Sequence, residues 1–148
     1  MDTDRLNRWL TLLANVAVVA GIIFLGFELR QNNELLQFEA GSIYFENRVW
    51  GANRTLENPE FARVIFKARS GEELDDFEAY QVGQFYRRVF LGLNWEYSQA
   101  MAGRLELIRN DRWRAIIKEN RYAIAAWDWA TENTLTPDFV RYMNDPAE

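Results

Sequence analysis

The sequence predicts an all-α protein, in which an N-terminal transmembrane helix continues into a small bundle of about four further helical segments. Three observations carry this prediction. A long apolar segment lies near the N-terminus, only three prolines occur in 148 residues, and apolar side chains recur at helical spacing through the rest of the chain. We expect two parts, an N-terminal anchor over residues 1–30 and a helical soluble domain over residues 31–148.

The anchor is predicted from residues 9–27, which are 19 residues without a charge and with one strongly polar side chain, Asn15. As a helix they span roughly 28 Å, close to the hydrocarbon thickness of a bilayer. A buried core helix would show a polar stripe, and this segment has none. A cleaved signal peptide has a shorter apolar region followed by a small-x-small site, whereas Phe27-Glu28-Leu29-Arg30 follows here. We therefore expect an uncleaved single-pass anchor.

The charges that flank the anchor favour a cytoplasmic N-terminus and a soluble domain outside the cytoplasm. Arg5 and Arg8 precede the apolar segment, and Arg30 is the only basic residue from residue 28 to residue 47. Within the membrane, Ala17 and Gly21 form a small-xxx-small pair that suits helix packing. Asn15 either seeks a partner there or reaches the headgroup region, since an amide is costly in hydrocarbon.

The predicted helix continues beyond the membrane with a stripe at heptad spacing. Its members are Leu29, Asn33, Leu36, Ala40 and Ile43, followed by Asn47 and Trp50. Such a stripe is typical of a seam between associating helices, and a buried Asn can fix its register. Leu35, Phe38, Phe45 and Val49 broaden the apolar face, which is more typical of a helix that packs on its own domain. Both interpretations stay open, and we expect the helix to end over residues 51–54.

Four further helices follow from capping signals and apolar spacing. Asn58-Pro59 begins one that ends at Ser70-Gly71, and the Ser70-x-x-Glu73 capping box begins another that runs to about residue 102. A third covers residues 112–131 behind Asn110 or Asp111, and Thr136-Pro137 begins the last. The side chains expected in the core of the last three are Phe77, Val82, Phe85, Val89, Phe90, Leu93, Tyr97, Ala100, Met101, Trp113, Ile116, Ile117, Ile124, Trp127, Phe139, Tyr142 and Met143.

Composition excludes several kinds of chemistry. The chain has no Cys and no His, which removes disulfides, thiolate nucleophiles, histidine bases and the usual zinc sites. Its net charge of −5 argues against nucleic-acid binding. Residues 104–121 carry a local excess of arginine and lysine, which either forms a solvated face or touches anionic lipid headgroups. We assign no catalytic, cofactor or metal residues, and we expect Glu96 on the polar edge of its helix.

Two segments carry a resemblance to a known group of proteins. Residues 13–36, LANVAVVAGIIFLGFELRQNNELL, and residues 127–143, with Trp127, Pro137 and Phe139, resemble the two ends of a family of bacterial single-pass membrane-anchored helical proteins with no assigned activity. The resemblance implies the inner membrane of a bacterium and adds no functional residues.

The sequence therefore predicts a membrane-anchored helical scaffold or interaction protein, self-associating or an accessory subunit of a membrane complex. Its expected partners are the lipid bilayer and either a second copy or another membrane protein. The alternative is a sensory domain that binds a lipid or a small apolar ligand, with Tyr80, Tyr86, Trp95 and Tyr97 on the wall of the pocket.

Overall fold

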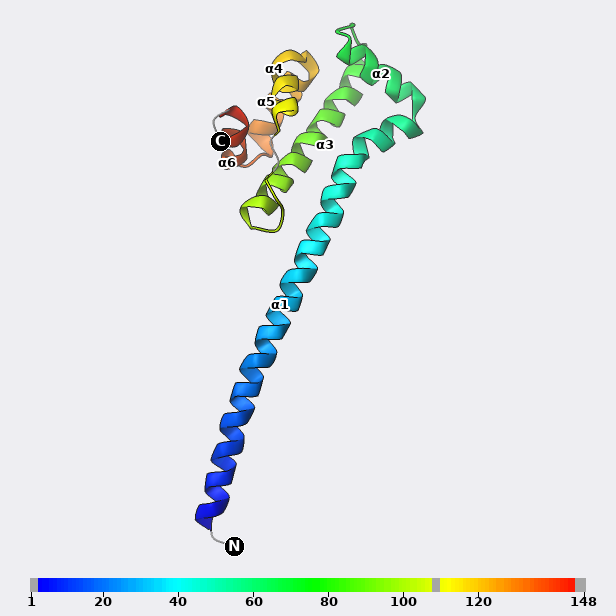
Figure 1. Cartoon of the computed structure of the whole chain (residues 1–148). Helices are drawn as coiled ribbons and strands as arrows, with labels where there is room; N and C mark the ends of the chain where they lie inside the picture. The colour runs from blue at the N-terminus through cyan, green and yellow to red at the C-terminus, as the bar shows by residue number, and fades with distance from the viewer. Residues whose placement is uncertain (1–2, 108–109, 146–148) are drawn as a thin grey trace. The chain divides into compact units, whose positions relative to one another are not determined.

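A computed structural model describes residues 3–107 and 110–145. They form six helices, α1 Thr3–Glu57, α2 Pro59–Arg69, α3 Asp76–Met101, α4 Asp111–Glu119, α5 Arg121–Asn133 and α6 Pro137–Asn144 (Figure 1). The all-helical prediction is thus confirmed for the described residues, with five helices after the first where the sequence predicts about four. The chain divides into two compact units, residues 1–39 and residues 40–148.

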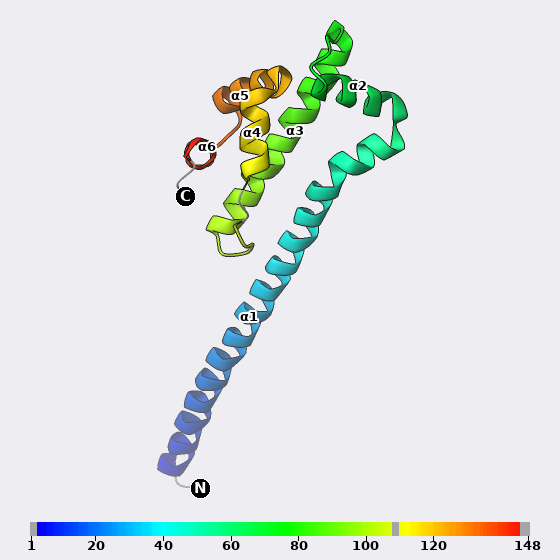
Figure 2. The same cartoon turned by 45° about the horizontal axis from the view of Figure 1, so that its top comes forward.

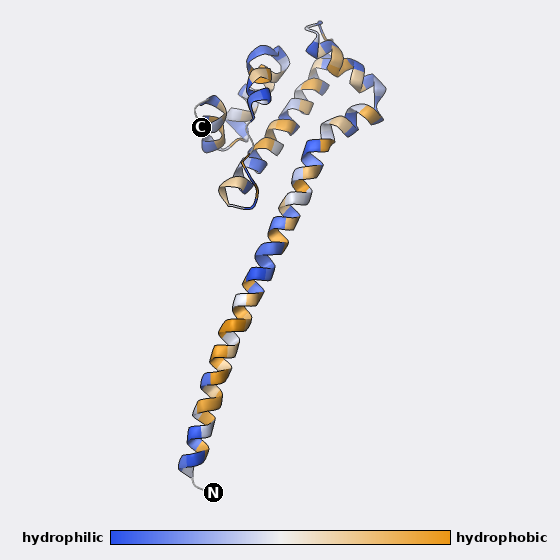
Figure 3. Cartoon of the chain, in the orientation of Figure 1, coloured by the Kyte–Doolittle hydropathy of each residue, from blue (hydrophilic) through white to orange (hydrophobic). Residues whose placement is uncertain are grey.

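The first unit is the N-terminal part of α1. It contains an 18-residue window that is long and apolar enough to cross a membrane, and none of that window is buried. Figure 3 shows hydrophobic colours concentrated in one stretch of this part, with hydrophilic turns before and after it. Its large side chains lie on the surface, with Trp9 64%, Phe24 65% and Phe27 67% exposed. So much exposed apolar surface in one stretch is unfavourable in water, which marks the segment as a candidate membrane span.

The first helix runs further than the sequence predicts. It passes through Gly51, where we expected it to end, and stops at Glu57. The physical stop is Asn58, whose backbone is extended at φ −133° and ψ 92°, followed by Pro59, which has no N–H to donate. The Asn58 side chain accepts a hydrogen bond from the Phe61 N–H at 3.0 Å, so the predicted start of α2 is confirmed.

The capping box lies one turn later than predicted. Ser70 is the C-cap of α2, and Gly71 turns the chain with a φ of +77°. Asp75 caps α3 instead, accepting from the Glu78 N–H at 2.8 Å, while Glu78 accepts from the Asp75 N–H at 3.1 Å. Glu78 also holds Lys67 of α2, whose Nζ lies 2.6 and 2.7 Å from the two carboxylate oxygens. The start of α3 is therefore fixed to α2.

The single helix predicted over residues 112–131 is two helices that meet at Asn120. Asn120 is both the C-cap of α4 and the N-cap of α5. Its side-chain oxygen accepts from the N–H groups of Tyr122 and Ala123, each at 3.1 Å, and its amide donates to the Ala68 carbonyl of α2 at 3.0 Å. These three hydrogen bonds stabilise a break between two helices at a point where the sequence has neither Gly nor Pro.

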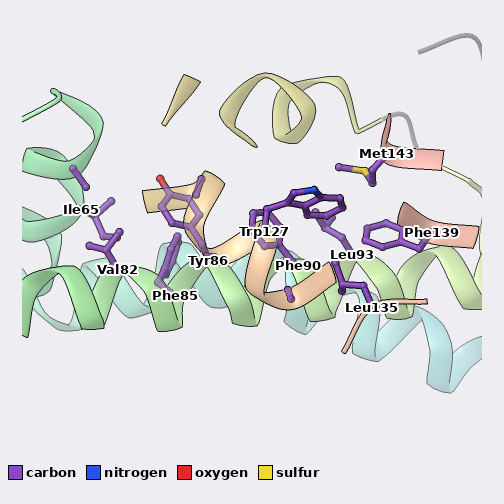
Figure 4. Packing of buried hydrophobic residues seen from close by; sticks show 14 of the residues in the cluster. Ile65, Val82, Phe85, Tyr86, Phe90, Leu93, Trp127, Leu135, Phe139 and Met143 are labelled. Carbon is purple, nitrogen blue, oxygen red and sulfur yellow. The ribbon is translucent and has the colours of Figure 1, made fainter. Parts of the chain in front are cut away.

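The core lies where α3 packs against α2, α5 and α6, and α4 in turn packs on α5 (Figure 1 and Figure 2). Figure 4 shows the buried side chains of this cluster, among which Val82, Phe90 and Phe139 have no exposed surface. Phe90 meets the Trp127 ring edge-on at 5.3 Å. Most predicted core positions are confirmed, but Phe77, Met101 and Ile124 are wrong, being 68%, 58% and 37% exposed.

Two polar contacts place the C-terminal helix. Thr136 occupies the predicted N-cap position of α6, but its side chain makes no capping bond and donates instead to the Asn94 oxygen of α3 at 2.7 Å. Arg114 of α4 is 8% exposed and donates to the Tyr142 carbonyl of α6. Of the basic residues over 104–121, Arg114 points into the domain, while Arg104, Arg112, Lys118 and Arg121 are exposed and Arg109 lies outside the described residues, so whether this exposed face is solvated or touches lipid stays a prediction.

Candidate ligand-binding cleft

A cleft of about 550 Å³ opens within the second unit, between the C-terminal part of α1, α2, α3 and the start of α4. Its apolar lining consists of Trp50, Ile65, Phe85, Val89, Leu93 and Trp113. Trp50 stacks on Phe85 at a centroid distance of 5.6 Å. An open hollow of this volume with an aromatic lining has the dimensions of a small-molecule site.

The charge of the cleft is opposite to the charge of the chain. Four arginines line it, Arg48, Arg69, Arg88 and Arg112, and its one carboxylate is Glu96. The whole chain carries a net charge of −5. Because low-dielectric walls concentrate the field of like charges, the cleft attracts anions although the protein as a whole repels them.

Glu96 lies inside the domain, so the expectation that it sits on a polar edge is wrong. Its side chain is 10% exposed, and its carboxylate accepts a hydrogen bond from Arg48 of α1 at 2.8 Å. Burial raises the pKa of Glu96 above its ordinary value, while the charge of Arg48 and its hydrogen bond oppose the rise. The pair joins α1 to α3 at one end of the cleft.

Arg88 is positioned at the rim by two contacts from α1. Its guanidinium donates to the Asn47 side-chain oxygen at 2.9 Å and lies 5.4 Å from the centroid of the Trp50 ring. Gly92 follows one turn later on α3, and a Cβ added there would lie 3.6 Å from the Asn47 side chain. Both this distance and the 3.5 Å to the Arg88 guanidinium are ordinary van der Waals contacts, so α1 and α3 are in contact here without requiring a glycine.

A second hollow of about 540 Å³ shares Arg69 and Arg112 with the cleft. Its other lining residues include Tyr86, Ile116 and Arg121. Burial raises the pKa of Tyr86, and the charge of the neighbouring Arg69 opposes the rise. Arg112 makes no hydrogen bond or ion pair within residues 3–107 and 110–145. Arg112, which has no such partner among the described residues, thus lines both hollows.

The aromatic pocket predicted from the sequence does not form. Tyr80 is 62% exposed, and Tyr86 lies in the core at 2% exposure. Tyr97 stacks on Tyr142 at 5.1 Å. None of these three residues, nor Trp95, lines the larger cleft. Spacing on one helix predicts a shared face, but it does not say which face meets a cavity.

The residues of the predicted association stripe differ in exposure. Leu29 is 57% and Ile43 is 43% exposed, Asn33 is exposed, Leu36 is half-buried and Ala40 is 3% exposed. Further along the same stripe, Asn47 and Trp50 contact α3, so this end packs within the domain. Asn15, Ala17 and Gly21 are all exposed on α1, and nothing lies within 4 Å of a Cβ added at Gly21.

A sequence signal for the cleft exists. Arg88, Gly92 and Glu96 recur at intervals of four, which places them on one face of α3. This spacing predicts a polar face on the helix, but it does not identify the segment that meets that face. The partner itself, Arg48, is 48 residues away and has no local signature.

Comparison of the chain with family models, with curated proteins and with solved structures finds no match. The resemblance carried by residues 13–36 and 127–143 therefore stays a prediction.

Proposed function

We propose that this protein is a membrane-anchored, non-catalytic binding protein whose helical domain takes up a small molecule. In this proposal the N-terminal part of α1 crosses the inner membrane of a bacterium once, with the N-terminus in the cytoplasm and the domain outside. The exposed apolar window of α1 supports the anchor. The positions of Arg5, Arg8 and Arg30 support the orientation.

The observation that carries the binding function is the cleft itself. Its volume of about 550 Å³ lies in the range of small-molecule sites. An apolar wall with a few converging polar groups is the usual composition of such sites, and here Trp50 and Phe85 supply the wall while the arginines and Glu96 supply the polar groups. A tethered domain with such a cleft is suited to sensing or capturing a ligand near the membrane.

Native mass spectrometry of the full-length protein, released from its own membrane, tests this function. We expect a bound small molecule in the wild-type protein and its loss from Thr55→Trp. Thr55 lines the cleft and its hydroxyl bonds only to carbonyls of its own helix, so the larger side chain fills the hollow without removing a tertiary contact. Ser42→Trp, at an exposed position of the same helix outside the cleft, is the matched control and should keep the ligand. A wild-type protein that never carries a ligand would contradict the proposal.

A scaffold that self-associates through α1, or docks on another membrane protein, is the second candidate. It is supported by large apolar side chains that stay exposed on α1 beyond the apolar window, including Leu35 at 54% and Phe38 at 75%. On this proposal Leu36→Glu and Ile43→Glu dissociate the oligomer without unfolding the domain. Gln37→Glu, at an exposed polar position off the heptad stripe, should leave the oligomer intact. A monomer in mild detergent would exclude self-association while leaving the ligand function untouched.

A further inference from the structure

We propose that the cleft takes a ligand of one chemical class: a flat apolar or aromatic body that carries a single acidic oxyanion, a carboxylate or a phosphate. This inference rests on the proposed binding function and names its ligand. The acid lies between Arg69 and Arg112, and the body lies against the rings of Trp50 and Trp113.

The first step of the argument is the state of each arginine. Arg48 is neutralised by Glu96 at 2.8 Å, and Arg88 is held by the neutral Asn47 side chain at 2.9 Å. Arg69 interacts with the neutral hydroxyl of Tyr86, and within residues 3–107 and 110–145 it forms no ion pair with a carboxylate. Arg112 makes no hydrogen bond or ion pair within the described residues. Among the described residues, the cleft therefore holds one neutralised cation and three that lack a carboxylate partner.

The second step is the place of the charge. Arg69, from α2, and Arg112, from α4, line both the cleft and the neighbouring hollow of about 540 Å³. Two guanidinium groups from different helices at one junction suit an acidic oxyanion, because each can donate two parallel N–H bonds to it. Neither group is buried, so the free protein leaves both cations in water at little cost.

The third step is the shape of the remaining space. Trp50 stacks on Phe85 with an interplanar angle of 23° and covers that ring, which is 5% exposed, so the aromatic surface left for a ligand in the cleft comes from the half-buried Trp50 and Trp113. Half-buried indole rings favour a flat body, which packs on them in an offset or edge-to-face arrangement. A bare inorganic anion would leave these rings in contact with water, and a neutral aromatic molecule would leave the arginines unpaired.

The test uses the full-length protein in lipid discs of zwitterionic phosphatidylcholine, titrated with three water-soluble probes by calorimetry. The probes are 1-naphthyl phosphate, inorganic phosphate and the neutral 1-naphthyl glucoside, and empty discs give the background. We expect 1-naphthyl phosphate to bind at least about tenfold more tightly than either of the others, since one charge-assisted contact accounts for about that factor. Its affinity should also fall as salt is raised.

Substitutions of the arginines test where the acidic group of the ligand binds. Arg112→Gln should weaken 1-naphthyl phosphate about tenfold, and adding Arg69→Gln should weaken it further. Arg63→Gln is the matched control, because Arg63 is an exposed arginine on α2 that lines neither hollow. Unchanged melting temperatures establish that each variant is folded. Arg112→Lys should recover part of the affinity, because lysine keeps the positive charge but cannot donate two parallel hydrogen bonds as arginine does.

Each other result has its own meaning. If the glucoside binds as tightly as 1-naphthyl phosphate, the ligand needs no acidic group, but the proposed binding function still holds. If inorganic phosphate binds as tightly as 1-naphthyl phosphate, the ligand needs no flat body. Loss of probe binding in discs that contain phosphatidylglycerol would identify a lipid phosphate as the occupant and overturn the flat body, because a lipid has none. A ligand seen by native mass spectrometry, with no binding of any probe, would refute the class alone.

Discussion

Replacing Arg48 by methionine should destabilise the helical domain more at neutral pH than at acidic pH. The substitution keeps most of the aliphatic length of the side chain but leaves the Glu96 carboxylate, 10% exposed, without its partner at 2.8 Å. Breaking a fully buried ion pair on one side costs about 3–5 kcal/mol. Because the Arg48 side chain is 31% exposed, water can reach the vacated position, and we expect about 2–3 kcal/mol.

The pH dependence follows from the protonation of Glu96. Burial raises the pKa of this carboxyl in the native state, so the folded protein holds the proton more tightly than the unfolded chain does. Stability from this group is therefore fully present below the unfolded-state pKa and is lost as pH rises through the folded-state pKa. Without Arg48 the opposing charge is gone and the folded pKa rises further. The deficit of Arg48→Met should thus be small at about pH 4 and reach its full size near neutral pH.

Thermal unfolding of the full-length protein in mild detergent, followed by circular dichroism at about pH 4 and about pH 8, measures both effects. At about 4 °C per kcal/mol for a domain of this size, the melting temperature should fall by roughly 8–12 °C at the higher pH. Glu96→Gln should cost only about 1 kcal/mol, because the amide oxygen still accepts from Arg48. In the Glu96→Gln background, Arg48→Met should lose its pH dependence. A deficit that is the same at both pH values, or a pH dependence that survives in the double variant, would refute the reasoning.

Three further predictions concern the fold, each measured as the change in melting temperature of the full-length protein in detergent. Phe90→Ala should destabilise the domain by about 3–5 kcal/mol, because Phe90 is fully buried and its ring contacts Trp127. Asn120→Ala should cost about 1–2 kcal/mol, since it removes the cap of α5 and the bond to Ala68, whereas the exposed Asn133→Ala is its control. Gly83→Ala should stabilise α3 by about 0.5–1 kcal/mol, because nothing lies within 4 Å of the added Cβ; a loss of stability there would contradict that geometry.

Local chemistry predicted the elements whose causes are local. Asn58-Pro59 set both the end of α1 and the start of α2, since an extended backbone and a missing N–H act within two residues. Phe61 and Ile65 of α2 are four residues apart, a spacing that predicts a shared apolar face, and both are buried. By contrast, Gly51 was read as a stop although the helix passes through it, because a single glycine costs a helix less than the tertiary contacts around it contribute.

Features with distant causes could not be predicted. The break at Asn120 depends on the Ala68 carbonyl of α2, which is 52 residues away in the sequence. The burial of Glu96 depends on Arg48 in the same way. The cleft was missed for the same reason, because its walls come from four helices and its lining residues look like an ordinary mixture of arginine and aromatic side chains on each one. The sequence shows the four-residue spacing of Arg88, Gly92 and Glu96, but it does not show that Arg48 is the partner of Glu96.

The length of α1 has a practical consequence for anyone who shortens this protein to make it water-soluble. Removing the chain up to Glu57 would discard the whole first helix and, with it, Asn47, Arg48 and Trp50. The remaining fragment would expose the Phe85 ring, which Trp50 covers, and would leave Glu96 as a lone buried carboxylate. A fragment that starts between residues 28 and 39 avoids both defects, because it leaves out the apolar segment while keeping every α1 side chain that lines the cleft.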